Sequence, residues 1–303
     1  MANAAAPPAR IETAAGLILS TAITHDSDVF ARFFAGYDKA FVLPNEKEDE
    51  EGFARCFALN FGADYARLSA LYGPYSEVCL IAEEGGLEIG GANFIAMPID
   101  AHTISANLNY IYINQHARGG GRFSKLVAGV RETLAALYPG RARTLIFIEQ
   151  NDPFAMSAED YARDTEFTGL DQLDRLRIWA KRGARVVDFP YAQPPLSPDQ
   201  QADDTLVYSV LGAGEDDLDA CVLEAHLRRF FGVSVLKGAA LEANAAASAQ
   251  VEALRIACAR GGRVAARNPQ ALLARLHVRE DIAALWANPP ASFRAALATP
   301  LSA

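Results

Sequence analysis

The stretch from Asn107 to Leu137, NLNYIYINQHARGGGRFSKLVAGVRETLAAL, decides the fold. Its opening part, 108–113, is rich in aromatic and β-branched residues, which predicts a strand. Apolar residues then recur at helical spacing and predict a helix over 121–138: Leu126, Val127, Val130, Leu134 and Leu137. Gly119, Gly120 and Gly121 are therefore expected at a strand-to-helix turn.

Such a turn favours a bound phosphate or pyrophosphate. It gathers backbone N–H groups and the positive end of the helix dipole at one point, and glycines let an anion approach the backbone closely. The P-loop pattern fails because Arg122 and Phe123 follow Gly121. The dinucleotide fingerprint matches only loosely, since hairpin strands precede the turn. A plain tight turn without a ligand stays open as the alternative.

Composition narrows the partners. The chain has 303 residues, 51% of them hydrophobic and 21% charged, which is typical of a globular protein. A net charge of −9 disfavours nucleic acid and would attract a cationic small molecule. No apolar run approaches the roughly 20 residues that span a bilayer, so we expect no membrane partner. Residues 1–22 lack the pattern of a signal peptide and are expected to form a flexible segment.

The cysteines point to a reducing compartment. Cys56, Cys79, Cys221 and Cys258 contain no CxxC pair. We therefore expect no metal site, no disulfide framework and a cytoplasmic location.

The order of elements suggests one mixed domain followed by a helical region. Helices are predicted at 28–37, 48–70, 121–138, 155–163 and 170–182, and strands at 77–83, 90–96, 106–113, 144–150, 185–189 and 205–211. Beyond these elements, helical runs are predicted at 218–231, 239–260, 269–276 and 279–286, without a strand. The expected divisions are 1–22, 23–213 and 214–303, the last as a possible homodimer surface.

This order resembles the GNAT superfamily of acyl-coenzyme A-dependent N-acyltransferases. In that family the turn reads Arg/Gln-x-x-Gly-x-Gly/Ala, and Arg118 and Gly121 match it while Phe123 stands at the third place. A second family segment is matched by Asn151 and by WAKRGA at 179–184, where Trp179 replaces a frequent tyrosine. The resemblance implies an α/β (α+β) fold with a mixed central sheet and flanking helices, here with a C-terminal all-helical extension.

The resemblance also implies acetyl-CoA as co-substrate and a primary amine, on a small molecule or a protein, as acceptor. The backbone of Ile111, Tyr112 and Ile113 would pair with the pantetheine arm. The pyrophosphate would lie on the backbone amides of the turn, which belong to Gly119, Gly120, Gly121, Arg122, Phe123 and Ser124. Asn151 would be a further cofactor-binding residue. Arg118 and Arg122 would reach the phosphates.

Acyl transfer needs a neutral amine, whose ordinary pKa is about 10.4, so a nearby carboxylate is expected as base. Glu149, at the end of the strand 144–150, is the candidate, with a solvated strand end as the alternative. Tyr112 or Tyr161 could protonate the leaving thiolate in place of the tyrosine that Trp179 replaces. Core packing is the alternative for Tyr112, which shares a strand face with Tyr110.

The loop NEKEDEEGF at 45–53 would recognise the acceptor. Its acidic residues could select a cationic amine, or they could simply form the solvated start of a helix. These residues are Glu46, Glu48, Asp49, Glu50 and Glu51. Two other classes of function stay open. One is an acyl-CoA-binding regulatory module without catalysis, suggested by Phe123 and Trp179. The other is an interaction protein, with Phe230 and Phe231 either as an exposed anchor or as ordinary core.

Overall fold

The structure is a computed structural model that describes residues 2–42, 47–195, 200–214, 218–276 and 291–298. Contacts divide the chain into two compact units. The first unit contains Met1–Ile146 and Ala225–Ala243, and the second contains Phe147–Glu224 and Asn244–Ala303. The predicted mixed α/β architecture is confirmed.

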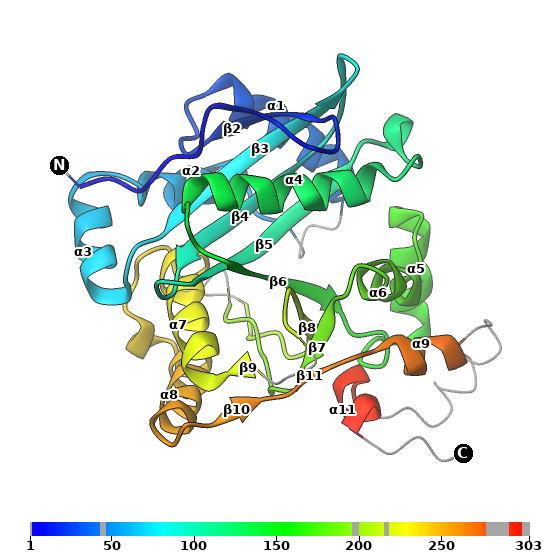
Figure 1. The fold of residues 1–303 in the computed structure, drawn as a ribbon. Coiled ribbons are helices and arrows are strands. Elements are labelled where there is room, and N and C mark those ends of the chain that lie inside the picture. The colour runs from blue at the N-terminus through cyan, green and yellow to red at the C-terminus, as the bar shows by residue number, and fades with distance from the viewer. Residues whose placement is uncertain (1, 43–46, 196–199, 215–217, 277–290, 299–303) are drawn as a thin grey trace. The chain divides into compact units, whose positions relative to one another are not determined.

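A mostly antiparallel sheet forms the first unit (Figure 1). Neighbouring strands follow the chain order and pair antiparallel: β1 (Arg10–Glu12), β2 (Ile18–Ala22), β3 (Ser76–Glu84), β4 (Leu87–Pro98) and β5 (Thr103–Ile113). The next strand, β6 (Arg143–Asn151), begins in this unit and continues into the second.

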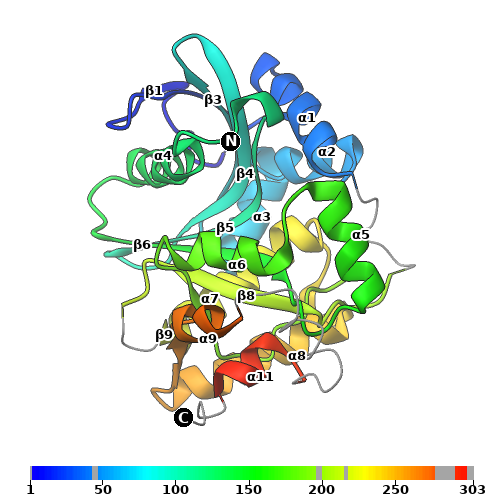
Figure 2. The same cartoon turned by 90° about the vertical axis from the view of Figure 1, so that its right-hand side faces the viewer.

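Helices cover both faces of this sheet (Figure 2). On one face lies α4 (Arg122–Leu137), whose apolar stripe is buried and whose Gly129 meets Leu19 of β2. On the other lie α1 (Asp28–Ala40) and α2 (Glu50–Ala58), followed by α3 (Gly62–Tyr72). Aromatic side chains fill this second layer: Phe30, Phe33, Tyr37, Phe53, Phe57 and Tyr112.

The β4–β5 ladder contains an irregularity that matters for the site. Asn93 pairs with Tyr110, but Ile95 pairs with Asn107, so β5 has one extra residue between these pairs. A bulge of this kind redirects side chains that would otherwise alternate. The side chains of Asn109 and its neighbour Tyr110 consequently lie on the same face of the sheet. Asn109 donates to Glu77 of β3, and Tyr110 packs against Tyr37 of α1.

Two predictions for the first unit are wrong. The predicted helix over 48–70 is two helices, because the backbone at Gly62 has a φ of +64°, which interrupts the helix, and α3 begins there. Residues 1–22, expected to be flexible, contain β1 and β2, and β2 extends the sheet at the edge of β3. Its residues include the β-branched Ile18 and Thr21, a local strand signal that the expectation of a flexible segment overlooked.

In the second unit, the strands follow the order β6, β8 (Leu206–Leu211), β7 (Arg185–Val187) and β11 (Ala266–Arg267). Its core includes Phe154, Leu173 and Phe293. Among its described residues, the helices that lie wholly in this unit are α5 (Ala158–Thr168), α6 (Gln172–Ala180), α8 (Ala245–Ala259), α9 (Gln270–Arg275) and α11 (Phe293–Ala298). The helix α7 (Ala220–Phe230) begins here and continues into the first unit, where Phe231–Val235 form a π-helical turn.

The region predicted as all-helical differs from that description. It contributes β11 to the edge of β7, and β9 (Leu218–Asp219) pairs with β10 (Arg263–Val264). Residues 225–243 belong to the first unit, so the compact units do not follow the predicted division at 213/214. The predicted helix at 279–286 lies outside the described residues, and α11 was not predicted.

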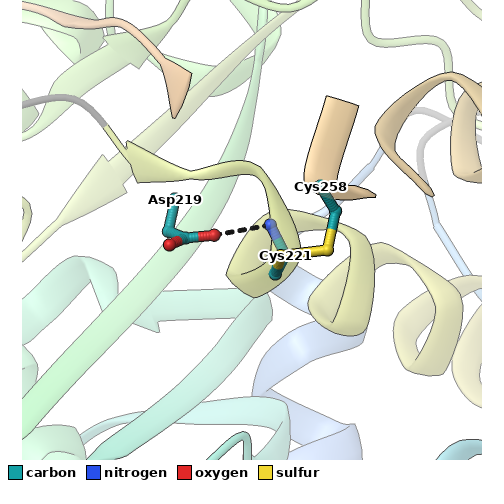
Figure 3. The surroundings of a disulfide bond; sticks show 3 residues. All are labelled: Asp219, Cys221 and Cys258. Carbon is teal, nitrogen blue, oxygen red and sulfur yellow. Dashed lines mark hydrogen bonds between the residues drawn. A yellow bond between two sulfur atoms is a disulfide. The ribbon is translucent and has the colours of Figure 1, made fainter. Parts of the chain in front are cut away.

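A disulfide joins Cys221 to Cys258 (Figure 3), so the expectation of no disulfide is wrong. The β9–β10 pair brings the start of α7 and the end of α8 together, 37 positions apart in sequence. Cys56 and Cys79 are free and buried. The cytoplasmic location rested partly on cysteine usage and stays a prediction. Among the described residues, no helix is both long enough and apolar enough to cross a bilayer.

Candidate functional site

The glycine turn is a left-handed backbone segment open to solvent. Gly119, Gly120 and Gly121 have φ values of +89°, +62° and +73°, and all three are exposed. Residues that carry a Cβ rarely adopt positive φ values, which explains the run of three glycines. The short 3-10 turn Gln115–Ala117 connects it to β5, and Gly121 is the N-cap of α4.

The backbone N–H groups of this turn can donate hydrogen bonds to a ligand. Within the described part of the chain, no backbone or side-chain acceptor is bonded to the N–H of Gly119, Gly120 or Gly121. Nothing lies within 4 Å of where a Cβ on Gly119 or Gly121 would stand. An anion there would meet free donors and the positive end of a helix of 16 residues.

Cations surround the turn. The Arg122 guanidinium lies 3.8 Å from where a Cβ on Gly120 would stand, and its Nη1 donates to the Ala117 carbonyl at 3.3 Å. Arg118 is exposed, and its side chain has no bonded partner among the described residues. Of the other predicted residues here, Phe123 is half-buried and Ser124 is exposed.

The predicted pantetheine strand is the last part of β5. Ile111, Tyr112 and Ile113 pair along one edge with the β4 residues Ala92, Gly91 and Gly90. The Tyr112 side chain is buried, and its hydroxyl donates to the Phe33 carbonyl at 3.0 Å. Burial raises the pKa of the Tyr112 hydroxyl. Its predicted role as an acid stays a prediction, and this hydrogen bond would have to break for it.

Glu149 and Asn151 lie on β6 in the second unit, and both are half-buried. The Tyr191 hydroxyl donates to the Glu149 carboxylate. Tyr191 stacks on Tyr208 with ring centroids 4.1 Å apart, and burial, then Glu149, raise the pKa of the Tyr191 hydroxyl. Tyr191 was not predicted, because a proline-rich polar loop follows it and obscured the apolar signal of Phe189 and Tyr191.

Four other predicted residues are buried. Trp179 lies on α6 and Tyr161 on α5, where burial and Asp171 raise the pKa of the Tyr161 hydroxyl. Phe230 and Phe231 are both core residues, so they form no exposed anchor.

A buried carboxyl in the first unit was also missed. Glu77 of β3 is 1% exposed and accepts three hydrogen bonds. Its Oε1 accepts from Nδ2 of Asn93 and of Asn109, each at 3.1 Å, and its Oε2 accepts from the Ser234 hydroxyl at 2.8 Å. Burial raises the pKa of Glu77 to about 7, although these donors and Lys237 oppose the rise. The donors come from β4, the β5 bulge and the turn at 231–235, so only the fold reveals them.

The acidic loop that was predicted to select the acceptor is partly engaged. Glu48 pairs with Lys237 at 2.6 Å, and Asp49 caps α2 by accepting from the Gly52 amide at 2.7 Å. Glu50 and Glu51 are exposed in the first turn of α2. Glu46 lies outside the described residues. Within the described ranges, no three His, Cys, Asp or Glu side chains gather as a metal site.

Neither a family model nor a curated protein matches this sequence. Solved structures that are similar to it are acetyltransferases of the GNAT family. One, a GNAT acetyltransferase from Desulfovibrio desulfuricans described as putative, is 16% identical with a TM-score of 0.36, over 65% of this chain and 98% of its own. Arabidopsis thaliana Naa50, in complex with the bisubstrate analogue CoA-Ac-MVNAL, is 9% identical with a TM-score of 0.36, over 64% of this chain and 99% of its own.

Diaminobutyrate acetyltransferase EctA from Paenibacillus lautus, in complex with diaminobutyric acid and coenzyme A, is 15% identical with a TM-score of 0.31, over 64% of this chain and 94% of its own. All three TM-scores are below 0.5, so these similarities say nothing about the residues of a site in this chain.

Proposed function

We propose that this chain is an N-acyltransferase that moves an acyl group, most simply acetyl, from acyl-coenzyme A to a primary amine. The observation that carries the proposal is the exposed turn at Gly119–Gly121, with three left-handed glycines and amides that have no acceptor among the described residues. The resemblance of the element order to the GNAT superfamily supports coenzyme A as the anion.

The residues present fit a diphosphate. The open space above Gly119 and Gly121 admits an anion to the backbone, and the first turn of α4 supplies positive potential. Arg118 and Arg122 can add charge-assisted hydrogen bonds to phosphate oxygens. Phe123 and Ser124 would contribute backbone only, and the last residues of β5, Ile111–Ile113, would lie along the pantetheine arm. Asn151 is proposed as a further contact.

The bound co-substrate supplies a thioester that is open to attack by an amine. An ammonium group must lose a proton before it attacks, and a carboxylate within reach provides the acceptor. Glu149 is our candidate base, and the Tyr191 hydroxyl bonded to it fixes the carboxylate orientation. Tyr112 is proposed as the acid for the leaving thiolate. The net charge of −9 favours approach of a cationic acceptor.

The test is thermal unfolding with and without acetyl-CoA or coenzyme A, on wild type, Gly121→Glu and Gly140→Glu. Gly140 is a matched control because it has a φ of +83°, has open space around it and follows the other end of α4. Both variants place a Cβ at a positive φ and add one negative charge. A ligand at 100 times its Kd stabilises a fold by about 2.7 kcal/mol, which raises Tm by a few degrees at this chain length.

We expect the rise in wild type and Gly140→Glu and its loss in Gly121→Glu. Equal shifts in both variants would place the ligand elsewhere, and no shift in any protein at millimolar ligand would refute the proposal. Turnover of acetyl-CoA with a panel of amines then distinguishes an enzyme from a binding protein.

A further inference from the structure

The β3–β4 hairpin carries a carboxylate to the cations at the glycine turn. Glu84 ends β3, and Gly85 and Gly86, with φ values of +60° and +81°, form the two-residue turn that leads to Leu87. Glu84 is thereby placed against the first turn of α4, where it contacts Arg122 and Lys125.

Each oxygen of this carboxylate takes one cation. Oε2 of Glu84 accepts from Arg122 Nε at 2.6 Å, and Oε1 accepts from Lys125 Nζ at 2.5 Å. Residues three apart share a helix face, so Arg122 and Lys125 form a pair of positive groups next to the glycine amides. Hydrogen bonds from Lys125 and Arg122 lower the pKa of Glu84, so the carboxylate is ionised at neutral pH.

The other acids of the hairpin make a different contact. Glu83 and Glu88 both pair with Arg32 of α1, at 2.5 and 3.0 Å. Their side chains are 28% and 30% exposed, close to the 24% of Glu84. Only Glu84 of these three acids therefore competes for the cations of the turn.

We propose that Glu84 is a specificity-determining residue of the phosphate site, an internal anion that occupies Arg122 and Lys125 until a ligand with a diphosphate displaces it. The inference rests on the proposed function. A single phosphate would face this carboxylate while holding the glycine amides alone. A diphosphate extends far enough to take both the amides and the two cations, so only a diphosphate ligand displaces Glu84, and Glu84 lowers the affinity for diphosphate more than the affinity for a single phosphate.

The experiment measures the Kd of inorganic phosphate, diphosphate and coenzyme A for wild type, Glu84→Gln and the matched control Glu88→Gln. We expect Glu84→Gln to bind inorganic phosphate about threefold to tenfold more tightly, because one neighbouring negative charge is removed. Diphosphate should gain more than phosphate, because it alone must displace Glu84 from the two cations, so the preference for diphosphate over phosphate should widen in Glu84→Gln. Glu88→Gln should match wild type, and the differences should shrink as salt is raised.

Two results would overturn the inference, and they differ in what they leave standing. If Glu84→Gln binds coenzyme A while its affinity for diphosphate is unchanged or weaker than that of wild type, Glu84 only holds the two cations in place and the proposed function survives. If no protein binds diphosphate or coenzyme A, the proposed function fails as well. Since Glu84 is partly exposed, its replacement should not prevent folding, which circular dichroism of each variant checks.

Discussion

The Ser234 hydroxyl donates a hydrogen bond of 2.8 Å to Glu77, joining the π-helical turn at 231–235 to β3 across 157 positions of sequence. The same carboxyl accepts from Asn109 at the β5 bulge. Glu77 thus ties three separate segments of the first unit to one titratable group.

This group should make stability depend on pH. The pKa of Glu77 is raised from an ordinary 4.5 to about 7 in the folded chain, so the folded state holds its proton more tightly than the unfolded state does between these values. The free energy of unfolding should therefore fall as pH rises through this window, by about 3 kcal/mol for this group. Urea unfolding of wild type and Glu77→Gln from pH 4.5 to 7.5 measures it, and parallel curves would contradict the raised pKa.

A second prediction concerns Gly36 of α1. Alanine is the better helix former by about 1 kcal/mol, but a Cβ here would lie 2.6 Å from two ring carbons of Tyr112. We expect Gly36→Ala to lower the free energy of unfolding by about 1–2 kcal/mol, since overpacking outweighs propensity.

The control for Gly36→Ala is a double-mutant cycle with Tyr112→Leu, which shortens the side chain. In that background Gly36→Ala should be neutral or stabilising. Equal destabilisation in both backgrounds would mean that the Tyr112 ring lies elsewhere, with its hydroxyl free for the proposed acid role.

A third prediction concerns the disulfide. Closing a loop of 37 positions should stabilise the fold by about 4 kcal/mol through the entropy of the unfolded chain. Guanidinium unfolding of the oxidised protein should therefore have a higher midpoint than that of the variant Cys221→Ser/Cys258→Ser. Wild type treated with reductant should coincide with the variant. An unchanged midpoint on reduction would show that the bond contributes no stability.

The fourth prediction concerns catalysis. Glu149→Gln should lower kcat by about 10²- to 10⁴-fold while leaving acetyl-CoA binding unchanged, because a general base contributes that much. Tyr191→Phe should have a smaller effect of the same kind, as it removes only the hydrogen bond that orients Glu149. Glu159→Gln, an exposed acid in the first turn of α5, is the control. Full activity of Glu149→Gln would assign the base to another residue.

The parts of the fold with strong local signals could be predicted from the sequence. The strand before the glycine run, the turn and α4 each have their own pattern, and their bounds agree with the structure to within a few residues. By contrast, β2 was overlooked although Ile18 and Thr21 favour a strand, and the break before Gly62 was hidden by continuous apolar periodicity.

The candidate site divides in the same way. The glycines at 119–121 predict a turn with left-handed backbone, because few other residues adopt positive φ. The partners of Glu77, Glu84 and Glu149 could not be predicted, since each is brought near by pairing or packing between distant segments. When a charged residue of a strand is buried, it must have a hydrogen-bonding or charged partner, but the sequence does not say which residue that partner is.

The bond between Cys221 and Cys258 makes the backbone from one to the other a closed ring. A protease that cuts once inside that ring leaves both fragments covalently joined. Nicked protein would therefore migrate as one species on a denaturing gel until a thiol is added, and would separate into two pieces afterwards.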